Sequence, residues 1–504
     1  MDMRRRFLIS KVEPKNTFNF NNYMTIEALE DGLQVSLNGN RIEYCVNGSN
    51  NWISLPSGTK TQSIYTGQKL SFRGIGLIPY VDKGIGTFSI SKRCKLTGNC
   101  NSLLFGDNAE TNLSLAGFGC AFYKLFYNCT TIESVSSTFL PSVIISAYCY
   151  GYMFYGCSKL IDSPDLPALS LENNCYQYMF YGCSSLKYPG EIIAKNLAPY
   201  CCYYMYYQCT SLMNTPTLYA ETLPSYCYNN MFYGCSSLTT APELYAKYLD
   251  VYSCYRMFSN CTGLKTATYV LKNSVSIGDN GCQYMFYGCT SLVQGPRELK
   301  ATLSSACYSH MFYGCTSLIY SPRLPSRIVA DYCYQYMFYG CTSLQEAPAL
   351  PALEMCSFCY QYMFYGCTSL MNLPTDLLPA TTLANSCYTY MFYRCTSITE
   401  VPDLPATTLS NSCYEGMFMY CSKIGVSMDL MARELTQNCY SYMFAGCSGL
   451  HTITMCATSI PYSNSLLNWV NSVSSSGSFI KHGSMNSLPT GASGIPRGWD
   501  VYDF

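Results

Sequence analysis

Cysteine is the most reactive residue that this chain repeats. The 504 residues include 32 Cys, enough thiols for disulfides, a metal site or a nucleophile. Zinc needs four ligands at close spacing. Cys356-Ser-Phe-Cys359 is the one C-x-x-C sequence, Cys201-Cys202 is the only adjacent pair, and the three histidines are scattered. We therefore expect no metal and no cofactor.

Most of the cysteines occur in pairs separated by seven or eight residues. In a helix that separation is about 12 Å, whereas the Cα atoms of a disulfide lie within about 7 Å. Equivalent cysteines of neighbouring repeats would stack at about 4.8 Å, so a disulfide between repeats remains open. We expect a column of buried thiols that act as small hydrophobes. Its members are Cys157, Cys183, Cys209, Cys235, Cys289, Cys315, Cys341 and Cys367.

Tyrosine is the second over-represented residue, with 49 copies. Most of them fall into three columns, which follow the first Cys of a repeat, precede its Met or follow its Phe. Cys, Met and Phe already fill a narrow interior, so part of this Tyr must be exposed. Exposed Tyr suits glycans or a protein partner, although stacked rings could also merely stabilise the repeat. The candidate binding residues are Tyr284, Tyr287, Tyr313, Tyr336, Tyr339, Tyr362 and Tyr365.

The carboxylates do not form a catalytic pattern. Acid–base catalysis needs carboxylates that converge on one face, but the repeats carry about one acid each, in non-equivalent places. Gly84-Ile-Gly86 is too short for a phosphate-binding loop. We expect no enzymatic activity. The acids concerned are Asp165, Glu191, Glu243, Glu298, Glu346 and Asp403.

The charge composition excludes two classes of partner. The chain has 30 basic and 30 acidic residues, and only 12% of its residues are charged. Nucleic-acid binders carry a basic footprint, which is missing here. No apolar run approaches the roughly 18 residues of a membrane span. We therefore expect neither nucleic-acid binding nor membrane insertion, and binding that depends only weakly on salt.

A repeat positions these residues. The segment Cys149-Tyr-Gly-Tyr-Met-Phe-Tyr-Gly-Cys157 recurs in thirteen units, 26 or 28 residues apart, over residues 119–455. Cys175, Met179, Cys183 and Leu186 follow an i, i+4, i+8, i+11 pattern, which predicts a short helical segment with one buried stripe. The rest of each unit predicts one short strand, with the recurring Pro at its end. The expected fold is an α/β repeat solenoid.

The flanks are predicted to cap the solenoid. Residues 1–22 form a polar arm, and the alternation of Leu33, Val35 and Leu37 predicts a β-rich domain over residues 23–118. Residues 456–504 predict a C-terminal cap. It begins with an amphipathic helix through Leu466, Trp469, Val470 and Val473, followed by strands at 478–480 and 499–502.

The amino-acid sequence of the repeat resembles that of a known family. Met-Phe-Tyr-Gly-Cys-Thr-Ser-Leu occurs at 285–292, 311–318, 337–344 and 363–370, and a Pro-x-Leu-Pro-like stretch often follows. Over residues 120–450 the chain resembles the BspA-like leucine-rich repeat of gut Bacteroidales surface proteins and of proteins of their phages. The resemblance implies a right-handed solenoid for adhesion or recognition, without enzymatic activity.

The N-terminus bears on where such a protein would be displayed. Arg4, Arg5 and Arg6 precede only three apolar residues, whereas a secretory signal has about 7–15. With the resemblance, this favours an exposed phage virion protein, a fibre or decoration, made in the host cytoplasm. It would bind a host-surface glycan or protein and contact other virion proteins through its N-terminal region. The alternatives are a bacterial cell-surface adhesin and a purely structural virion spacer.

Overall fold

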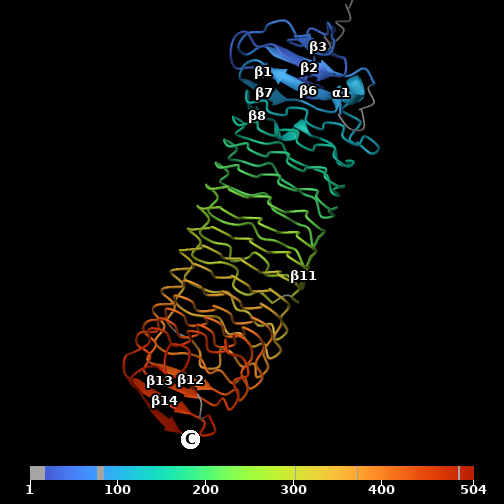
Figure 1. Ribbon diagram of the computed structural model, residues 1–504. Helices are drawn as coiled ribbons and strands as arrows, with labels where there is room; N and C mark the ends of the chain where they lie inside the picture. Colours follow the sequence, from blue (N-terminus) through green and yellow to red (C-terminus); the bar gives the residue numbers. More distant parts are fainter. Residues whose placement is uncertain (1–17, 77–83, 301, 372, 486–487) are drawn as a thin grey trace, which may run out of the picture.

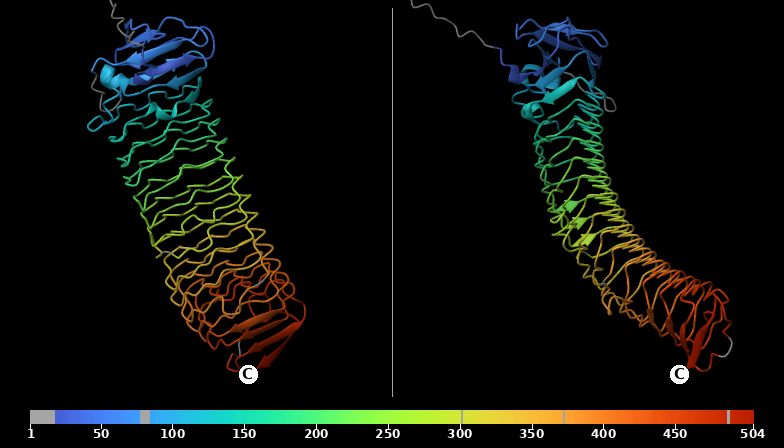
Figure 2. Two further views of the ribbon diagram at one scale, coloured as in Figure 1. Left: turned by 180° about the vertical axis from the view of Figure 1, so that it is seen from behind. Right: turned by 90° about the vertical axis from the view of Figure 1, so that its left-hand side faces the viewer.

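The protein is a curved rod of stacked coils (Figure 1, Figure 2). The computed structural model describes residues 18–76, 84–300, 302–371, 373–485 and 488–504. A β region lies at the N-terminal end of the rod and a small parallel sheet at the C-terminal end. Of the predicted polar arm, residues 1–17 lie outside the described residues, and Phe20–Asn22 forms a 3-10 turn, η1.

The N-terminal β region is built from two sheets. The larger has the strand order β4-β3-β5-β1-β7-β8, in which β8 is Ile132–Val135, and the smaller pairs β2 with β6. Val35 and Leu37 of β2 are fully buried, as their alternation predicts. One α-helix, α1 (Ser102–Phe105), occurs in the described part of the chain. The strands are β1 (Met24–Ala28), β2 (Val35–Gly39), β3 (Ile42–Val46), β4 (Ile53–Leu55), β5 (Lys69–Arg73), β6 (Gly86–Ile90) and β7 (Cys94–Thr97).

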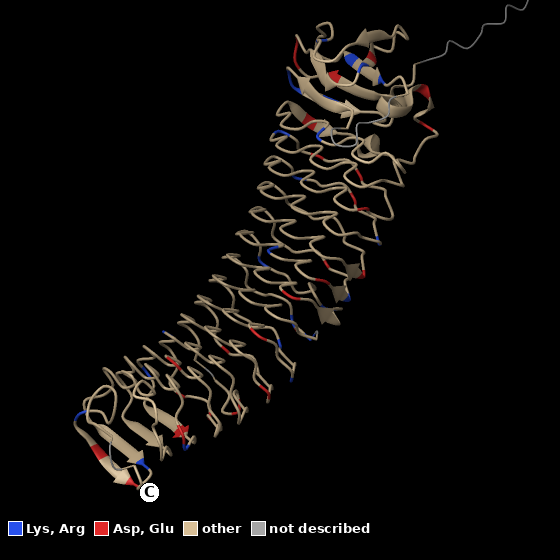
Figure 3. Ribbon diagram, turned by 45° about the vertical axis from the view of Figure 1, so that its right-hand side comes forward, with Lys and Arg blue, Asp and Glu red and all other residues tan. Residues whose placement is uncertain are grey.

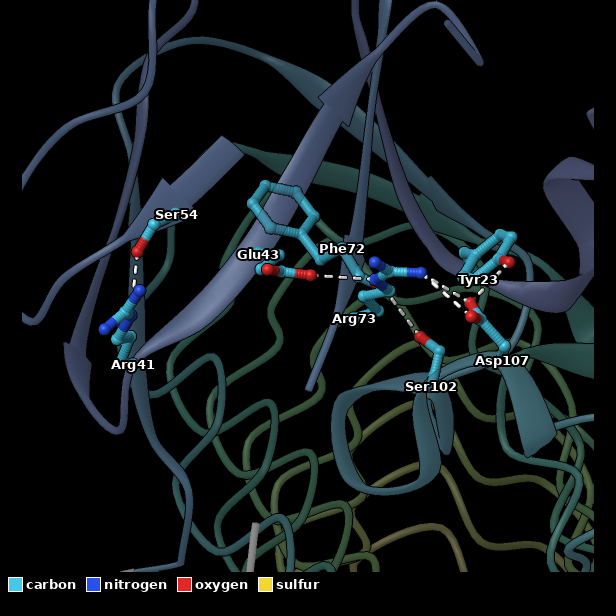
Figure 4. A network of polar contacts seen from close by, with 8 residues as sticks. All are labelled: Tyr23, Arg41, Glu43, Ser54, Phe72, Arg73, Ser102 and Asp107. Carbon is cyan, nitrogen blue, oxygen red and sulfur yellow. Dashed lines mark hydrogen bonds and ion pairs between the residues drawn. The ribbon is translucent and has the colours of Figure 1, made fainter. Parts of the chain in front are cut away.

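Arg73 ties this region together (Figure 4). Its guanidinium bonds Glu43 at 2.9 Å and Asp107 at 2.8 Å, and lies 4.2 Å from the ring centroid of Trp52. The Tyr23 hydroxyl donates to Asp107 at 2.8 Å. Burial and this carboxylate raise the pKa of Tyr23 to about 12. The two carboxylates therefore pair with one half-buried cation and tie β3 and β5 to the segment that follows α1.

The sheet of the N-terminal region continues into the solenoid. β7 is antiparallel to β1 but parallel to β8 (Ile132–Val135), which belongs to the first coil. Parallel bridges then join Ser134 to Asp162 and Asp162 to Tyr188 in successive coils. The β region thus covers the first coil by pairing with it, which protects the end of the repeat stack.

The predicted helical segment of each repeat is wrong. Residues 332–341 instead form a row of four-residue turns, in which Tyr332, Tyr336 and Gly340 have φ of 60°, 57° and 70°. In an α-helix each N–H bonds the carbonyl four residues earlier and φ is negative. Here the Met337 N–H donates three residues back, to Tyr334 O at 3.1 Å. The repeat is therefore a β-solenoid coil with a turn row in place of the helix.

Alternate N–H groups of the turn row point to the next coil. Tyr334 donates to Cys359 O at 3.0 Å and Tyr336 to Gln361 O at 2.9 Å, while the N–H groups between them bond within their own turn. Each coil is thus hydrogen-bonded both to itself and to its neighbour. Residues 333 and 334, then 337 and 338, point inward, so the row alternates two buried residues with two outer ones.

The other half of each coil is extended, as predicted. Neighbouring coils pair in parallel here, either through isolated bridges or through the short strands β9 (Thr222–Leu223), β10 (Tyr248–Leu249) and β11 (Ser276–Ile277). Pro164 lies between the bridged residues Asp162 and Leu166, consistent with a residue that lacks an N–H. The recurring prolines are Pro164, Pro216, Pro242, Pro296, Pro322, Pro348, Pro374 and Pro402.

At the C-terminal end the predicted helix is wrong and the predicted strands are confirmed. The amphipathic helix predicted through Leu466 and Val473 is wrong, because Asn468 and Ser472 have positive φ and the segment is another turn row. Trp469 is fully buried and donates from Nε1 to Gly494 O at 2.9 Å. Both predicted strands are confirmed, in a parallel sheet of order β12-β13-β14-β15. These are β12 (Val426–Leu430), β13 (Thr452–Met455), β14 (Gly477–Lys481) and β15 (Trp499–Asp503).

Candidate functional site

Two rows of half-buried aromatic rings run along the turn rows. We call the residues that precede Met the first ladder and those that follow Phe the second ladder. All seven predicted binding tyrosines belong to these ladders and have intermediate exposure. In the first ladder are Tyr284, Tyr336 and Tyr362, and in the second Tyr287, Tyr313, Tyr339 and Tyr365.

The second ladder is two runs of stacked rings. From Tyr287 to Tyr393 the ring centroids are 4.3–4.9 Å apart, with interplanar angles of 17° or less. From Tyr127 to Tyr233 they are 4.6–4.9 Å apart. Ser259 takes the place of a tyrosine between the two runs.

The first ladder contains a histidine. His310 stacks between Tyr284 and Tyr336, with centroid distances of 4.4 and 4.5 Å. Its Nδ1 lies 2.7 Å from the Ser309 hydroxyl. Burial, and then the charge of Arg256, lowers the pKa of His310 to about 4. The ring is therefore neutral at pH 7 and stacks as another aromatic.

Stacking decides what the ladders present to solvent. At these centroid distances the ring faces cover one another, because stacked rings are in contact. The solvent-facing parts are ring edges and phenol hydroxyls, repeated once per coil. Burial, followed by neighbouring tyrosines, raises the pKa of Tyr336 and Tyr207 to about 12. The phenols are therefore neutral hydrogen-bonding groups at physiological pH.

Charges are sparse along the solenoid (Figure 3). Arg256 replaces a tyrosine in the first ladder, and its guanidinium lies 4.8 Å from the Tyr284 ring centroid and 5.3 Å from that of Tyr255. Lys124 and Arg394 make similar cation–π contacts with ladder tyrosines. The cations near the ladders are thus held against rings.

The third tyrosine column lies in the core. The sequence left open which columns turn inward. The structure buries this one because the turn row points two neighbouring residues inward, the first Cys and the Tyr after it. Tyr308 and Tyr334 are at most 1% exposed, and their hydroxyls have no hydrogen-bond partner. The column includes Tyr150, Tyr176, Tyr228, Tyr308, Tyr334, Tyr360, Tyr388, Tyr414 and Tyr440, all 2% exposed or less.

The second cysteine of each repeat has a partner that sequence reasoning missed. Cys315 donates from Sγ to Phe286 O of the preceding coil at 3.1 Å, and Cys341 donates likewise to Phe312 O at 3.1 Å. Burial raises the pKa of these thiols well above its ordinary value. The cysteines of the predicted thiol column are all fully buried and make this bond at 3.0–3.2 Å: Cys157, Cys183, Cys209, Cys235, Cys289, Cys315, Cys341 and Cys367.

The carboxylates considered for catalysis stay apart. Glu243 forms an ion pair with Lys272, and Asp165 accepts from the Glu191 backbone N–H at 3.0 Å. Glu346 and Asp403 are exposed. Over the described residues, no three His, Cys, Asp or Glu side chains are placed to hold a metal ion, and no helix is long and apolar enough to span a membrane.

Comparison with known proteins supports the repeat assignment. Residues 123–239, 176–292, 255–374 and 356–468 match the model of the BspA type leucine rich repeat region (6 copies). Together these matches cover more than half of the chain. No curated protein sequence matches it.

Replacing a cysteine of the buried thiol column tests its hydrogen bond. Cys315→Ala should lower the free energy of unfolding by about 1–2 kcal/mol, since it leaves Phe286 O without a donor and opens a small cavity. Urea unfolding under reducing conditions measures this. Cys456→Ala, at a half-exposed thiol, should change it by less than about 0.5 kcal/mol. Equal effects would contradict a specific role for the column.

The half-buried His310 should make the solenoid acid-sensitive. Its pKa is depressed in the folded state, so the unfolded chain binds a proton below about pH 6.5 while the folded chain does so only near pH 4. Stability should therefore fall over this window, by up to about 3 kcal/mol. His310→Tyr restores the ladder residue of other coils and should remove this component from melts at pH 7 and pH 4.5. An unchanged pH dependence would contradict the assignment.

Proposed function

The chain belongs to the BspA-type leucine-rich-repeat family, and on this premise we propose that it is a non-enzymatic recognition or adhesion protein whose two tyrosine ladders contact the partner. Solenoids of this family are a protein-interaction fold and are generally non-enzymatic. The scattered carboxylates of this chain agree with that character.

The regular spacing of the rings in the second ladder is the main support for this proposal. Between Tyr287 and Tyr393 it presents one phenol edge per coil at 4.3–4.9 Å. Each contact made through one hydroxyl is weak. A partner that is itself repetitive can engage many of them at once, and linked weak contacts add up to strong binding. A polysaccharide chain or an array of surface proteins meets this condition.

We propose a bacterial surface glycan or surface protein as the partner and an exposed phage virion protein, a fibre or decoration, as the setting. The support for this setting is the resemblance of the repeat wording to proteins of gut Bacteroidales and their phages. A bacterial cell-surface adhesin of the same family is the alternative. Immunogold labelling of purified phage particles and of bacterial cells separates the two.

Removing ladder hydroxyls tests the contact surface. The combined variant Tyr287→Phe, Tyr313→Phe, Tyr339→Phe and Tyr365→Phe keeps every stacked ring. It removes the four ladder hydroxyls and the hydrogen bonds that successive hydroxyls from Tyr313 to Tyr393 make with one another. We expect it to bind intact Bacteroidales cells at least about tenfold more weakly than the wild type, because several hydrogen bonds to the partner are lost. Flow cytometry with fluorescently labelled protein measures this.

The buried column offers a matched control in the same coils. Tyr308→Phe and Tyr334→Phe delete hydroxyls that are buried and without a partner. They should leave cell binding unchanged, and stability unchanged or slightly higher. Wild-type protein that binds no cells would point to a purely structural spacer. Ladder variants that bind as well as the wild type would place the contact elsewhere.

Salt dependence gives a second measure of ladder binding. The ladders present neutral phenols, so raising NaCl from 50 to 500 mM should change cell binding by less than about threefold. A loss of tenfold or more would show that charges, and not the phenols, dominate this contact.

A further inference from the structure

A groove lies between the extended halves of neighbouring coils, away from the ladders. It has a volume of about 590 Å³, and the side chains that the argument uses are Lys195, Asn196, Tyr219, Glu221, Thr222 and Tyr245. It adjoins β9, at the edge of the solenoid that carries the three short strands (Figure 3). None of the ladder residues lines it.

The repeat changes its outward residue at this groove. In several coils the residue after the inward-facing Leu is Pro, as in Pro167, Pro325 and Pro351, and in others it is aliphatic or Lys. In two successive coils it is Tyr219 and Tyr245, beside the paired Leu218 and Leu244. Two aromatic rings therefore stand side by side where the repeat usually places none.

These two rings are more open than the ladder rings. Tyr219 and Tyr245 are 38% and 39% exposed, and their centroids are 5.9 Å apart with an interplanar angle of 25°. Their wider spacing and tilt leave ring surface accessible inside the groove. A ring face next to polar groups is the usual arrangement for packing the C–H face of a sugar.

Polar groups in the groove lack partners. The hydroxyls of Tyr219, Thr222 and Tyr245 form no hydrogen bond with the described residues, and neither does the ammonium group of Lys195. The side-chain amide of Asn196 donates from Nδ2 to the Ser170 hydroxyl at 3.2 Å, and its carbonyl oxygen can still accept a hydrogen bond. The groove thus offers donors and acceptors in the number that a polyhydroxylated ligand requires.

The groove also holds one positive charge without a counter-ion. Glu221 is paired with Lys247 at 2.9 Å, so its charge is compensated, whereas Lys195 has no ion-pair partner in the described chain. Lys195 and Tyr219 come from neighbouring coils, which lie about 4.8 Å apart. A ligand seated on the ring of Tyr219 therefore has the ammonium of Lys195 within reach of a carboxylate.

We propose that this groove binds an acidic sugar, a uronate unit of an oligosaccharide. Its ring packs against Tyr219 and Tyr245, and its carboxylate pairs with Lys195. The hydroxyls of the sugar bond Thr222, Asn196 and the two phenols. An acidic peptide would satisfy Lys195 but would leave the hydroxyl partners and the ring faces largely unused. This site is independent of the ladders and adds a carbohydrate specificity to the recognition role.

A printed array of uronate oligosaccharides tests the proposal. Each galacturonate, glucuronate or mannuronate chain is placed beside the neutral hexose chain of the same linkage, with an Asp/Glu peptide as a third probe. The wild-type protein should bind at least one uronate chain about tenfold more tightly than its neutral counterpart, the effect of one charge-assisted contact. Failure to bind any uronate chain, or equal binding of the neutral chains or the peptide, would overturn the proposal.

Variants then assign the contacts. Lys195→Gln should weaken uronate binding about tenfold and leave neutral chains unaffected, while Tyr219→Ala should weaken both. Lys423→Gln and Tyr320→Ala alter exposed residues outside the groove and should stay within twofold of the wild type. Uronate binding that survives both groove variants would overturn the proposal. Circular dichroism melts confirm that each variant is folded.

The same array separates the groove from the ladders. The protein with Phe at 287, 313, 339 and 365 should bind uronates as the wild type does, even where its binding to cells is lost. Uronate binding should also weaken with NaCl, since it depends on an ion pair. Loss of array binding in the Phe variant would place the uronate contact on the ladders and overturn the groove proposal.

Discussion

The structure depends on how each turn row divides its backbone donors. One N–H closes a turn within the coil, and the next bonds a carbonyl of the following coil, as Met337 and Phe338 show with bonds of 3.1 and 2.8 Å. This alternation requires a left-handed residue at every fourth position, which costs about 1–2 kcal/mol for a residue other than glycine. Tyr336 adopts it nonetheless, because two networks of hydrogen bonds hold it in place. Buried backbone groups are satisfied in this way without a helix.

The same division of backbone donors sets the spacing of the side chains in neighbouring coils. Because neighbouring turn rows are bonded at every second residue, equivalent side chains stand directly above one another. Buried phenylalanines stack from Phe126 to Phe444 with centroid distances of 5.4–6.0 Å, interrupted only by Tyr206, whose ring continues the stack. The tyrosine ladders and the thiol column follow the same register. The columns of side chains are thus aligned by the backbone hydrogen bonds between coils.

Much of this could be predicted from the sequence, and the failures have physical causes. The length of the repeat, the inward Cys, Met and Leu positions, and the terminal strands β14 and β15 could all be predicted from the spacing of residues in the sequence. The helix was not distinguishable, because an eight-residue separation such as Cys175 to Cys183 fits two helical turns to within about 80° and two four-residue turns equally well. The turn row also points the residue after the first Cys inward, which buries the third tyrosine column. The groove at Tyr219 and Tyr245 departs from the repeat, so no periodicity could reveal it.

The parallel pairing of β7 with β8 has a consequence for how the chain assembles. A turn row of this solenoid bonds only about half of its backbone N–H groups within its own coil and needs the coil beside it for the others. The N-terminal sheet is synthesised first, and it supplies a finished edge on which β8 can form. The turn row of each completed coil then provides a row of N–H groups that bond the carbonyls of the next coil. The rod can therefore grow in one direction as it leaves the ribosome, and a fault in an early coil would be passed to every coil that follows.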